Sequence, residues 1–257
     1  TRELHSVPDG ILQQISQCSL QEAIWSLSDR GLVNQEKQLI KILEDKLLDN
    51  TSFNIDPKVV LKGATRPVII HFGDNLSGVF KVKSRHPSSN FKSEVAAYKI
   101  DRLFGFNLVP MTVIKKVGGR TGSLQYFIKE AQSAPEGFQK NSNLRAFDYI
   151  INNKDRNSHN VLLKEGRQIG IDHGLSIRKY NYIGNLLKLS DRVKWALQIK
   201  RDKTRSVCYH PKKRPELFCP SASVYKKIKD MTKDKFDEEL RNFLPKAKRK
   251  IIYKRLN

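Results

Sequence analysis

The sequence has few cysteines, no long apolar run and no internal repeat. Its three cysteines, Cys18, Cys208 and Cys219, lack the spacing of a metal site, and their odd number argues against a disulfide framework. We therefore expect a reducing compartment. No stretch approaches the ~18 apolar residues that a membrane-spanning helix needs. These absences exclude a disulfide-stabilised scaffold, a zinc-finger protein and a repeat array.

Acidic residues are scarce beside basic ones. The 48 Lys and Arg against 26 Asp and Glu give a net charge of +22 at pH 7. Residues 176–257 alone carry 24 basic and 8 acidic side chains, a net charge of +16. A field this positive attracts polyanions such as nucleic acid, an anionic membrane leaflet or a multiply phosphorylated small molecule. The charge is too concentrated for an ordinary solvated surface.

The hydrophobic period changes along the first half of the chain. Apolar residues recur at helical spacing over residues 9–48, with Gly31 placed as a helix stop, and residues 50–57 are expected to be a linker. Short β-rich runs and one helical run follow. In chain order these are the strands KVVLKG (58–63), PVIIHF (67–72) and GVFKVK (78–83), the helix 91–104, and the strands LVPMTVIKKV (108–117) and SLQYFI (123–128).

The second half is predicted to be mainly helical. A polar connector over residues 133–143 precedes it, and a hairpin pattern over 161–172 interrupts it. The expected helices are LRAFDYIINN (144–153), SDRVKWALQIKR (190–201), SVYKKIKDM (223–231) and KFDEELRNFLPKAKRKIIYKRL (235–256). We therefore predict an α+β fold with a helical extension (1–56), a small β-rich lobe (57–132) and a basic, mainly helical lobe (133–257).

The chemistry is predicted to lie in FDYIINNKDRNSHNVLLKEGRQIGIDHGL, residues 147–175. Asp155 is followed five residues later by Asn160, and Asp172 then opens an Asp-His-Gly element. Phosphoryl transfer needs a carboxylate to accept the substrate's hydroxyl proton, and an amide oxygen and a second carboxylate to hold Mg²⁺. Each residue alone would be read as a turn residue. Together they predict Asp155 as the base and Asn160 and Asp172 as metal ligands.

A lysine and a glutamate upstream complete this pattern. Lys81 lies in the predicted strand GVFKVK and could reach nucleotide phosphates, and Glu94 on the next helix could pair with it. Lys83 has the same strand parity, but Lys81 directly follows the apolar Val79 and Phe80 and is preferred. A solvent-exposed pair would contribute little.

Glycine is scarce where a phosphate-binding loop would be expected. Between the first two strands only Gly63 offers an unobstructed backbone, and Pro67 removes an amide donor. Downstream, Arg156 could hold Asp155 or a phosphate. His159 and His173 flank the metal positions, where a lone histidine more often orients a loop than binds a metal.

These segments resemble the atypical protein kinases related to phosphatidylinositol 3- and 4-kinases and to Fam20-like and HipA-like kinases. GVFKVK resembles the lysine strand, and SEVAAYKIDRLFGFNLVPMTV the glutamate helix with the strand after it. GSLQYFIKEA resembles the strand entering the nucleotide hinge, while DRNSHN and IDHG resemble the catalytic loop and the D-F-G element. The resemblance spans roughly residues 58–257 and implies a two-lobed kinase-like fold.

The resemblance also implies an activity: transfer of phosphate from ATP to an alcohol group, with Mg²⁺ or Mn²⁺ as cofactor. It implies Lys81 and Glu94 as the nucleotide pair, Asp155 as base, Asn160 and Asp172 as metal ligands, and a nucleotide hinge at Ile128, Lys129 and Glu130. Two departures stand out, because the glycine loop is degenerate and no A-P-E element follows. The usual activation-loop switch is therefore not expected.

The poor glycine loop and the basic body most resemble a secreted bacterial effector kinase activated by host inositol hexakisphosphate. That implies delivery into a host cytoplasm, with contact to anionic membranes open. A protein substrate is expected, although the sequence does not name it. The candidate residues for an inositol polyphosphate are Lys83, Arg85, Lys92, Arg178, Lys179, Lys200, Arg201, Lys203 and Arg205.

Two other functions are open. A phosphoinositide lipid kinase would use the basic residues to hold a lipid headgroup at the membrane surface. A pseudokinase or polyanion-binding module would have the charge without catalysis. Nucleic acid is not the expected partner, because the sequence has no zinc spacing and no aromatic RNA-binding signature.

Overall fold

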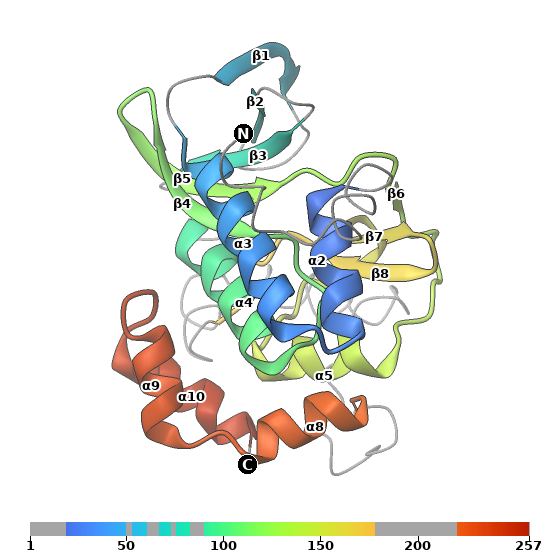
Figure 1. The fold of residues 1–257 in the computed structure, drawn as a ribbon, viewed down its shortest axis with the longest axis vertical. Coiled ribbons are helices and arrows are strands. Elements are labelled where there is room, and N and C mark those ends of the chain that lie inside the picture. Colours follow the sequence, from blue (N-terminus) through green and yellow to red (C-terminus); the bar gives the residue numbers. More distant parts are fainter. Residues whose placement is uncertain are drawn as a thin grey trace, which may run out of the picture. The chain divides into compact units, whose positions relative to one another are not determined.

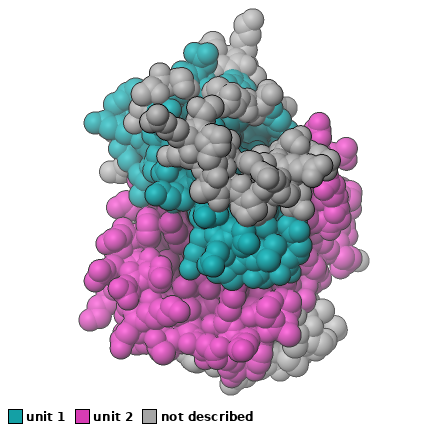
Figure 2. All heavy atoms as spheres, in the orientation of Figure 1, with its two compact units in different colours: residues 1–86, 110–129 teal, residues 87–109, 130–257 magenta. Residues whose placement is uncertain are grey.

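The computed structural model of the chain describes residues 19–49, 53–60, 67–72, 76–82, 90–177 and 220–256. The chain forms two compact units, which Figure 2 colours separately. Unit 1 contains residues 1–86 and 110–129, and unit 2 contains residues 87–109 and 130–257. The last crossing between the units falls between Lys129 and Glu130.

The described part of unit 1 begins with two helices (Figure 1), α2 (Leu20–Asp29) and α3 (Val33–Leu48). Ser19 caps α2 in a reciprocal capping box with Glu22, which satisfies two backbone N–H groups at the helix start. Gly31 turns the chain between the helices with φ of +71°, in the left-handed region that glycine adopts without strain. The predicted stop at this glycine is confirmed.

The rest of unit 1 is an antiparallel sheet with strand order β1-β2-β3-β5-β4. Its strands are β1 (Phe53–Val60), β2 (Val68–Phe72), β3 (Ser77–Val82), β4 (Thr112–Val117) and β5 (Arg120–Tyr126). Helix α3 is joined to the sheet by Lys115, whose ammonium donates to the carbonyl oxygens of Leu47 (2.9 Å) and Asp49 (2.6 Å). Burial of this ammonium lowers the pKa of Lys115.

The expected linker over residues 50–57 is partly wrong. Strand β1 begins at Phe53, and Phe53 and Ile55 lie opposite Phe72 and Ile70 of β2. Pro57 argues against a strand because it lacks an N–H group, but β1 is at the edge of the sheet, where one side of the strand needs no partner.

Unit 2 contains α4 (Phe91–Phe104), as the periodicity predicts, and α5 (Ser142–Ile150). Asn90 caps the start of α4, and Gly105 ends it in the left-handed conformation. Unit 2 also contains a short sheet in the order β6-β7-β8, built from β6 (Gln132–Ser133), β7 (Val161–Lys164) and β8 (Arg167–Gly170). The expected hairpin over 161–172 is β7 with β8.

The chain ends with α8 (Ala222–Lys229), α9 (Lys233–Leu240) and α10 (Lys246–Leu256). The single helical run expected over residues 235–256 is therefore two helices. The break lies before Pro245, which has no N–H to continue α9 but fits the position that precedes a helix. Arg255 joins α10 to α5 by donating to the carbonyl oxygen of Tyr149 at 2.7 Å.

The helix expected over residues 190–201 and Gly63 lie outside the described residues. Within the part of the chain that the structure describes, no helix has the length and hydropathy to cross a membrane.

Candidate active site

The segment between α5 and the β7–β8 hairpin contains the predicted base and one predicted metal ligand. Helix α5 buries Leu144, Phe147 and Ile150, and Asp148 is buried with them. A 3₁₀ turn, η2 (Ser158–Asn160), closes the loop after the helix. Because Asp148 is a carboxylate among apolar side chains, it needs partners inside the protein.

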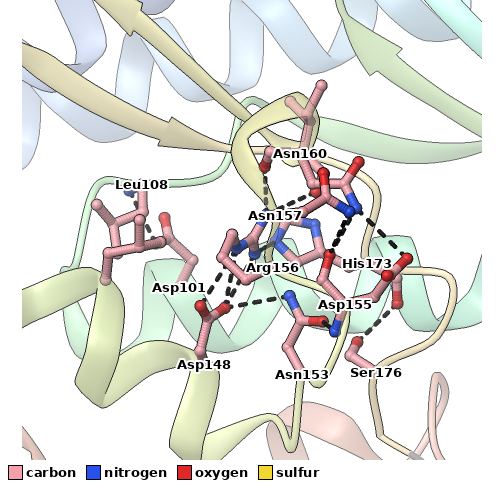
Figure 3. Close-up of polar contacts among 12 residues, drawn as sticks. Asp101, Leu108, Asp148, Asn153, Asp155, Arg156, Asn157, Asn160, His173 and Ser176 are labelled. Carbon is pink, nitrogen blue, oxygen red and sulfur yellow. Dashed lines mark hydrogen bonds and ion pairs between the residues drawn. The ribbon is translucent and has the colours of Figure 1, made fainter. Parts of the chain in front are cut away.

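Arg156 supplies those partners (Figure 3) and is itself fully buried. Its Nε and Nη2 donate to the Asp148 carboxylate at 3.1 and 3.0 Å. Its Nη1 donates to the carbonyl oxygens of Asn160 and Ile171, and its Nη2 also donates to Nε2 of His173 at 2.8 Å. One side chain thus joins α5, the loop of residues 151–160 and the segment after β8.

The same contacts define the state of His173. A guanidinium can only donate, so Nε2 of His173 accepts and the ring proton is on Nδ1. Nδ1 points at Oε2 of Glu94 from 3.6 Å, just beyond hydrogen-bond distance, and this oxygen accepts the backbone N–H of His173 at 2.8 Å. Burial, and then the neighbouring Arg156 charge, lower the pKa of His173. A neutral histidine therefore connects α4 to the Asp-His-Gly element.

Asp155 is held through its backbone on both sides. Its N–H donates to Oδ1 of Asn153 at 3.1 Å, and Nδ2 of Asn153 donates to Asp148 at 3.1 Å. Its carbonyl oxygen accepts from Nδ2 of Asn160 at 2.6 Å, and the same Nδ2 lies 3.4 Å from the Asp155 carboxylate. The structure thus brings the predicted base and the first predicted metal ligand into direct contact.

Asp172 lies between two residues whose backbones are fixed. The carbonyl oxygen of Ile171 accepts from Arg156, and the N–H of His173 donates to Glu94. Asp172 itself is exposed and has φ of +54°, a left-handed conformation that Asp adopts more readily than most residues. Its backbone position is therefore set by the Arg156 and Glu94 contacts.

The donor set fits a hard divalent cation. Nδ2 of Asn160 is engaged by Asp155, which leaves Oδ1, and no described residue donates a hydrogen bond to that oxygen. Within the described ranges no group of three His, Cys, Asp or Glu side chains could hold a metal. Mg²⁺ commonly takes one or two protein oxygens and completes its shell with phosphates and water. Asn160 and Asp172 would supply such oxygens to Mg²⁺ or Mn²⁺ beside a nucleotide.

The predicted lysine belongs to unit 1 and its predicted partner to unit 2. Lys81 is half-buried on β3, opposite Ser123 of β5 and on the other face of the sheet from Phe80. Strand β3 ends at Val82, and Lys83 lies outside the described residues. Glu94 is buried in the first turn of α4.

The predicted nucleotide hinge coincides with the division of the chain into units. Ile128 is buried and follows β5, Lys129 is the last residue of unit 1, and Glu130 is the first of this stretch in unit 2. Glu130 has φ of +60°, so the chain turns sharply at this position.

Among the nine predicted polyanion ligands, only Lys92 falls within the described residues, where it is exposed near the start of α4. The others, Lys83, Arg85, Arg178, Lys179, Lys200, Arg201, Lys203 and Arg205, lie outside them.

Three buried residues are central to this site but were given no firm role from the sequence: Asp148, Arg156 and His173. Arg156 was expected to hold Asp155 or a phosphate, and instead it holds the loop through Asp148 and two carbonyl oxygens. The one available signal was Asp148, the single acidic residue of α5, which stands among apolar side chains. A charge in such a position calls for a buried partner of opposite sign.

The fold is that of the protein kinase-like proteins. The crystal structure of the Golgi casein kinase with Mn/ADP bound is similar, with a TM-score of 0.53 at 12% sequence identity over 86% of this chain and 74% of that one. A second structure of the Golgi casein kinase has a TM-score of 0.52 at 14% identity, covering 85% of this chain and 72% of that one.

One of the similar structures is bacterial. The Helicobacter pylori proinflammatory kinase CtkA has a TM-score of 0.50 at 14% identity over 81% of this chain and 92% of its own. No protein-family model and no curated protein sequence matches the chain. At these identities the comparisons establish a two-lobed α+β kinase-like fold, as predicted from the sequence.

Proposed function

We propose that the chain is an atypical protein kinase that transfers the γ-phosphoryl group of ATP to a Ser or Thr hydroxyl, on another protein or on itself. The observation that carries the proposal is the contact between Asp155 and Asn160 inside a loop fixed by Arg156, within a kinase-like fold. The similar structure with Mn/ADP bound supports a nucleotide and a divalent cation as the ligands.

Each residue then has a defined task. The Asp155 carboxylate accepts the hydroxyl proton while the hydroxyl oxygen bonds to the γ-phosphorus, and the bond to the β–γ bridging oxygen breaks to release ADP. Asn160 and Asp172 would hold a divalent cation, which when bound would neutralise charge on the phosphates. Lys81 contributes a further positive charge, and Ile128 to Glu130 hold the base of the nucleotide.

The proposal extends to regulation by an inositol polyphosphate bound to the basic surface and to a role as a bacterial effector. The net charge of +16 over residues 176–257 supports the first. The sequence resemblance supports the second, together with a bacterial kinase among the similar structures.

The test is transfer of label from γ-³²P-ATP with Mg²⁺ or Mn²⁺, to mixed protein acceptors and, separately, to vesicles containing phosphatidylinositol. We expect labelled protein. Asp155→Asn should reduce the rate about 10²- to 10⁴-fold, the usual contribution of a positioned base. Asp230→Asn, an exposed acid at the end of α8, is the matched control and should leave the rate unchanged.

Labelling of lipid with none of protein would identify a lipid kinase instead. Equal rates for the wild type and Asp155→Asn would show that Asp155 is not the base. No labelling of either acceptor, with and without inositol hexakisphosphate, would identify a pseudokinase.

A further inference from the structure

A pocket lies in unit 2, and none of its lining residues belongs to the Asp155 loop. It has a volume of about 450 Å³ and is formed by the start of α4 and by the connection from α9 to α10. This volume is within the range of small-molecule sites, ~300–1,000 Å³. The break in the helix before Pro245 creates one wall, because the chain turns there between α9 and α10.

The lining of this pocket is basic. No lining residue is an acid, and five are cations: Lys92, Arg241, Lys246, Lys248 and Arg249. One acid lies behind the wall, where Asp237 pairs with Nε of Arg249 at 2.7 Å and with Lys233 at 2.8 Å. Nη1 of Arg249 donates to the carbonyl oxygen of Leu244, so this guanidinium is fixed in position. One acid against this many cations leaves a strong positive field inside the pocket.

Three of these cations lie where the dipole of α10 is unfavourable to positive charge, and Asp237 compensates only Arg249 among them. Lys246, Lys248 and Arg249 are within the first four residues of α10, and that helix has no acidic residue in its first turn. The amino-terminal end of a helix has partial positive charge, so cations there are destabilising and an anion is stabilising. A bound anion would relieve both this repulsion and the repulsion among the side chains.

The pocket is not suited to stacked bases. Phe243 is its one aromatic lining residue, and the ammonium of Lys99 sits 5.7 Å from the centre of that ring. Single-stranded nucleic acid is held by basic grooves that carry free aromatic faces. A compact anion fits the shape and the charge better.

We propose that this pocket binds a small anion that carries two or more phosphate groups, such as an inositol polyphosphate or an inorganic polyphosphate. The site differs from the polyanion ligands expected from the sequence, of which it includes Lys92 alone. Phosphate groups would pair with Arg241, Lys246 and Arg249, the last as a preoriented guanidinium.

The pocket is connected to the candidate active site through α4. Lys92 and Glu94 are in the same first turn of that helix, and Glu94 accepts the backbone N–H of His173. An anion bound at Lys92 would therefore steady the turn that positions the Asp-His-Gly element. This link to catalysis rests on the proposed kinase function, whereas the binding itself does not.

Isothermal titration calorimetry at physiological salt, without nucleotide, tests the site. The probes are inositol hexakisphosphate, inorganic tripolyphosphate, sulfate and a single-stranded oligonucleotide. We expect one molecule of either polyphosphate to bind per chain, at least tenfold more tightly than sulfate. The double variant Arg241→Gln/Lys246→Gln should weaken that binding tenfold or more, because it removes two charge-assisted contacts.

The matched control removes the same charge elsewhere. Lys37→Gln/Lys226→Gln changes two exposed lysines on α3 and α8 and should alter the affinity by less than twofold. Equal weakening by both double variants would show a diffuse charge effect and overturn the proposal. So would tight polyphosphate binding that the pocket variant leaves unchanged, or binding of the oligonucleotide alone. Since no nucleotide is present, these outcomes are independent of kinase activity.

Discussion

Unit 2 uses basic side chains in two opposite ways. At the candidate active site Arg156 is fully buried, pairs with Asp148 and donates to two carbonyl oxygens and a histidine. In the basic pocket Arg241 and Lys246 are exposed and line a surface with no acid. In the first arrangement the guanidinium is fully engaged by the protein, which makes it a positioning group. In the second arrangement the positive charges of Arg241 and Lys246 can bind a ligand. Hydrogen-bond satisfaction, more than residue type, separates structural cations from binding ones.

Removing Arg156 should have the largest effect on stability. Arg156→Met leaves the buried Asp148 carboxylate without its partner and should lower the free energy of unfolding by about 3–5 kcal/mol. Chemical denaturation measures this, with Arg120→Met, an exposed arginine on β5, as the control. A loss equal to that of the control would mean that Arg156 does not hold the loop.

Asp101 should make stability fall as the pH rises. Its Oδ1 accepts the N–H of Leu108 at 2.9 Å, no described residue donates to its Oδ2, and burial raises its pKa from 3.8 to about 7. The folded state therefore binds a proton more tightly than the unfolded state between these values. The contribution is complete below about pH 4 and is lost as the pH approaches 7, by up to about 1.4 kcal/mol per pH unit.

The Asp101→Asn variant isolates this contribution. Asparagine resembles the protonated acid, so the variant should lose that slope and gain stability over the wild type above pH 7. Urea denaturation at pH 5, 6, 7 and 8 measures the difference between the two proteins, in which the contribution of His173 cancels. Parallel curves for the two proteins would show that Asp101 titrates normally.

Gly170 should be sensitive to a single methyl group. A Cβ at this position would lie 3.1 Å from Nη2 of Arg156 and 3.3 Å from Nε2 of His173. Gly170→Ala should therefore cost about 1–2 kcal/mol by displacing the guanidinium. A double-mutant cycle with Arg156→Met tests the cause, because the cost should largely disappear when the guanidinium is absent. Additive losses would place the strain elsewhere.

The smallest expected effect is on the melting temperature. Its sign should differ between a lysine at the start of a helix and one at the end of a helix. Lys246→Gln removes a charge from the start of α10 and should raise the melting temperature by about 1–2 °C, whereas Lys226→Gln, in the last turn of α8, should lower it slightly. Differential scanning calorimetry without added anion compares them. A decrease for both variants would show that the charge of Lys246 is already balanced in the folded protein.

The sequence predicted those features that depend on local pattern. The bounds of α4 and the stop at Gly31 follow from residue types at short range, whereas the roles of Asp155, Asn160 and Asp172 stay predictions. The contacts of Arg156 could not be predicted in the same way, because they join residues up to 17 positions apart through tertiary packing. Pro57 and Pro245 could not be interpreted from local pattern alone, because the effect of a proline depends on its place in a sheet or at a helix end.

Intact-mass analysis tests the central claim most directly. The chain and a mixed protein acceptor are incubated with ATP and Mg²⁺ or Mn²⁺, with and without inositol hexakisphosphate, as wild type and as Asp155→Asn. The account predicts mass increments of whole phosphate groups for the wild type and, over the same incubation time, at least about 100-fold fewer for the variant. An increment equal to AMP, or increments in Asp155→Asn as large as those of the wild type, would contradict it.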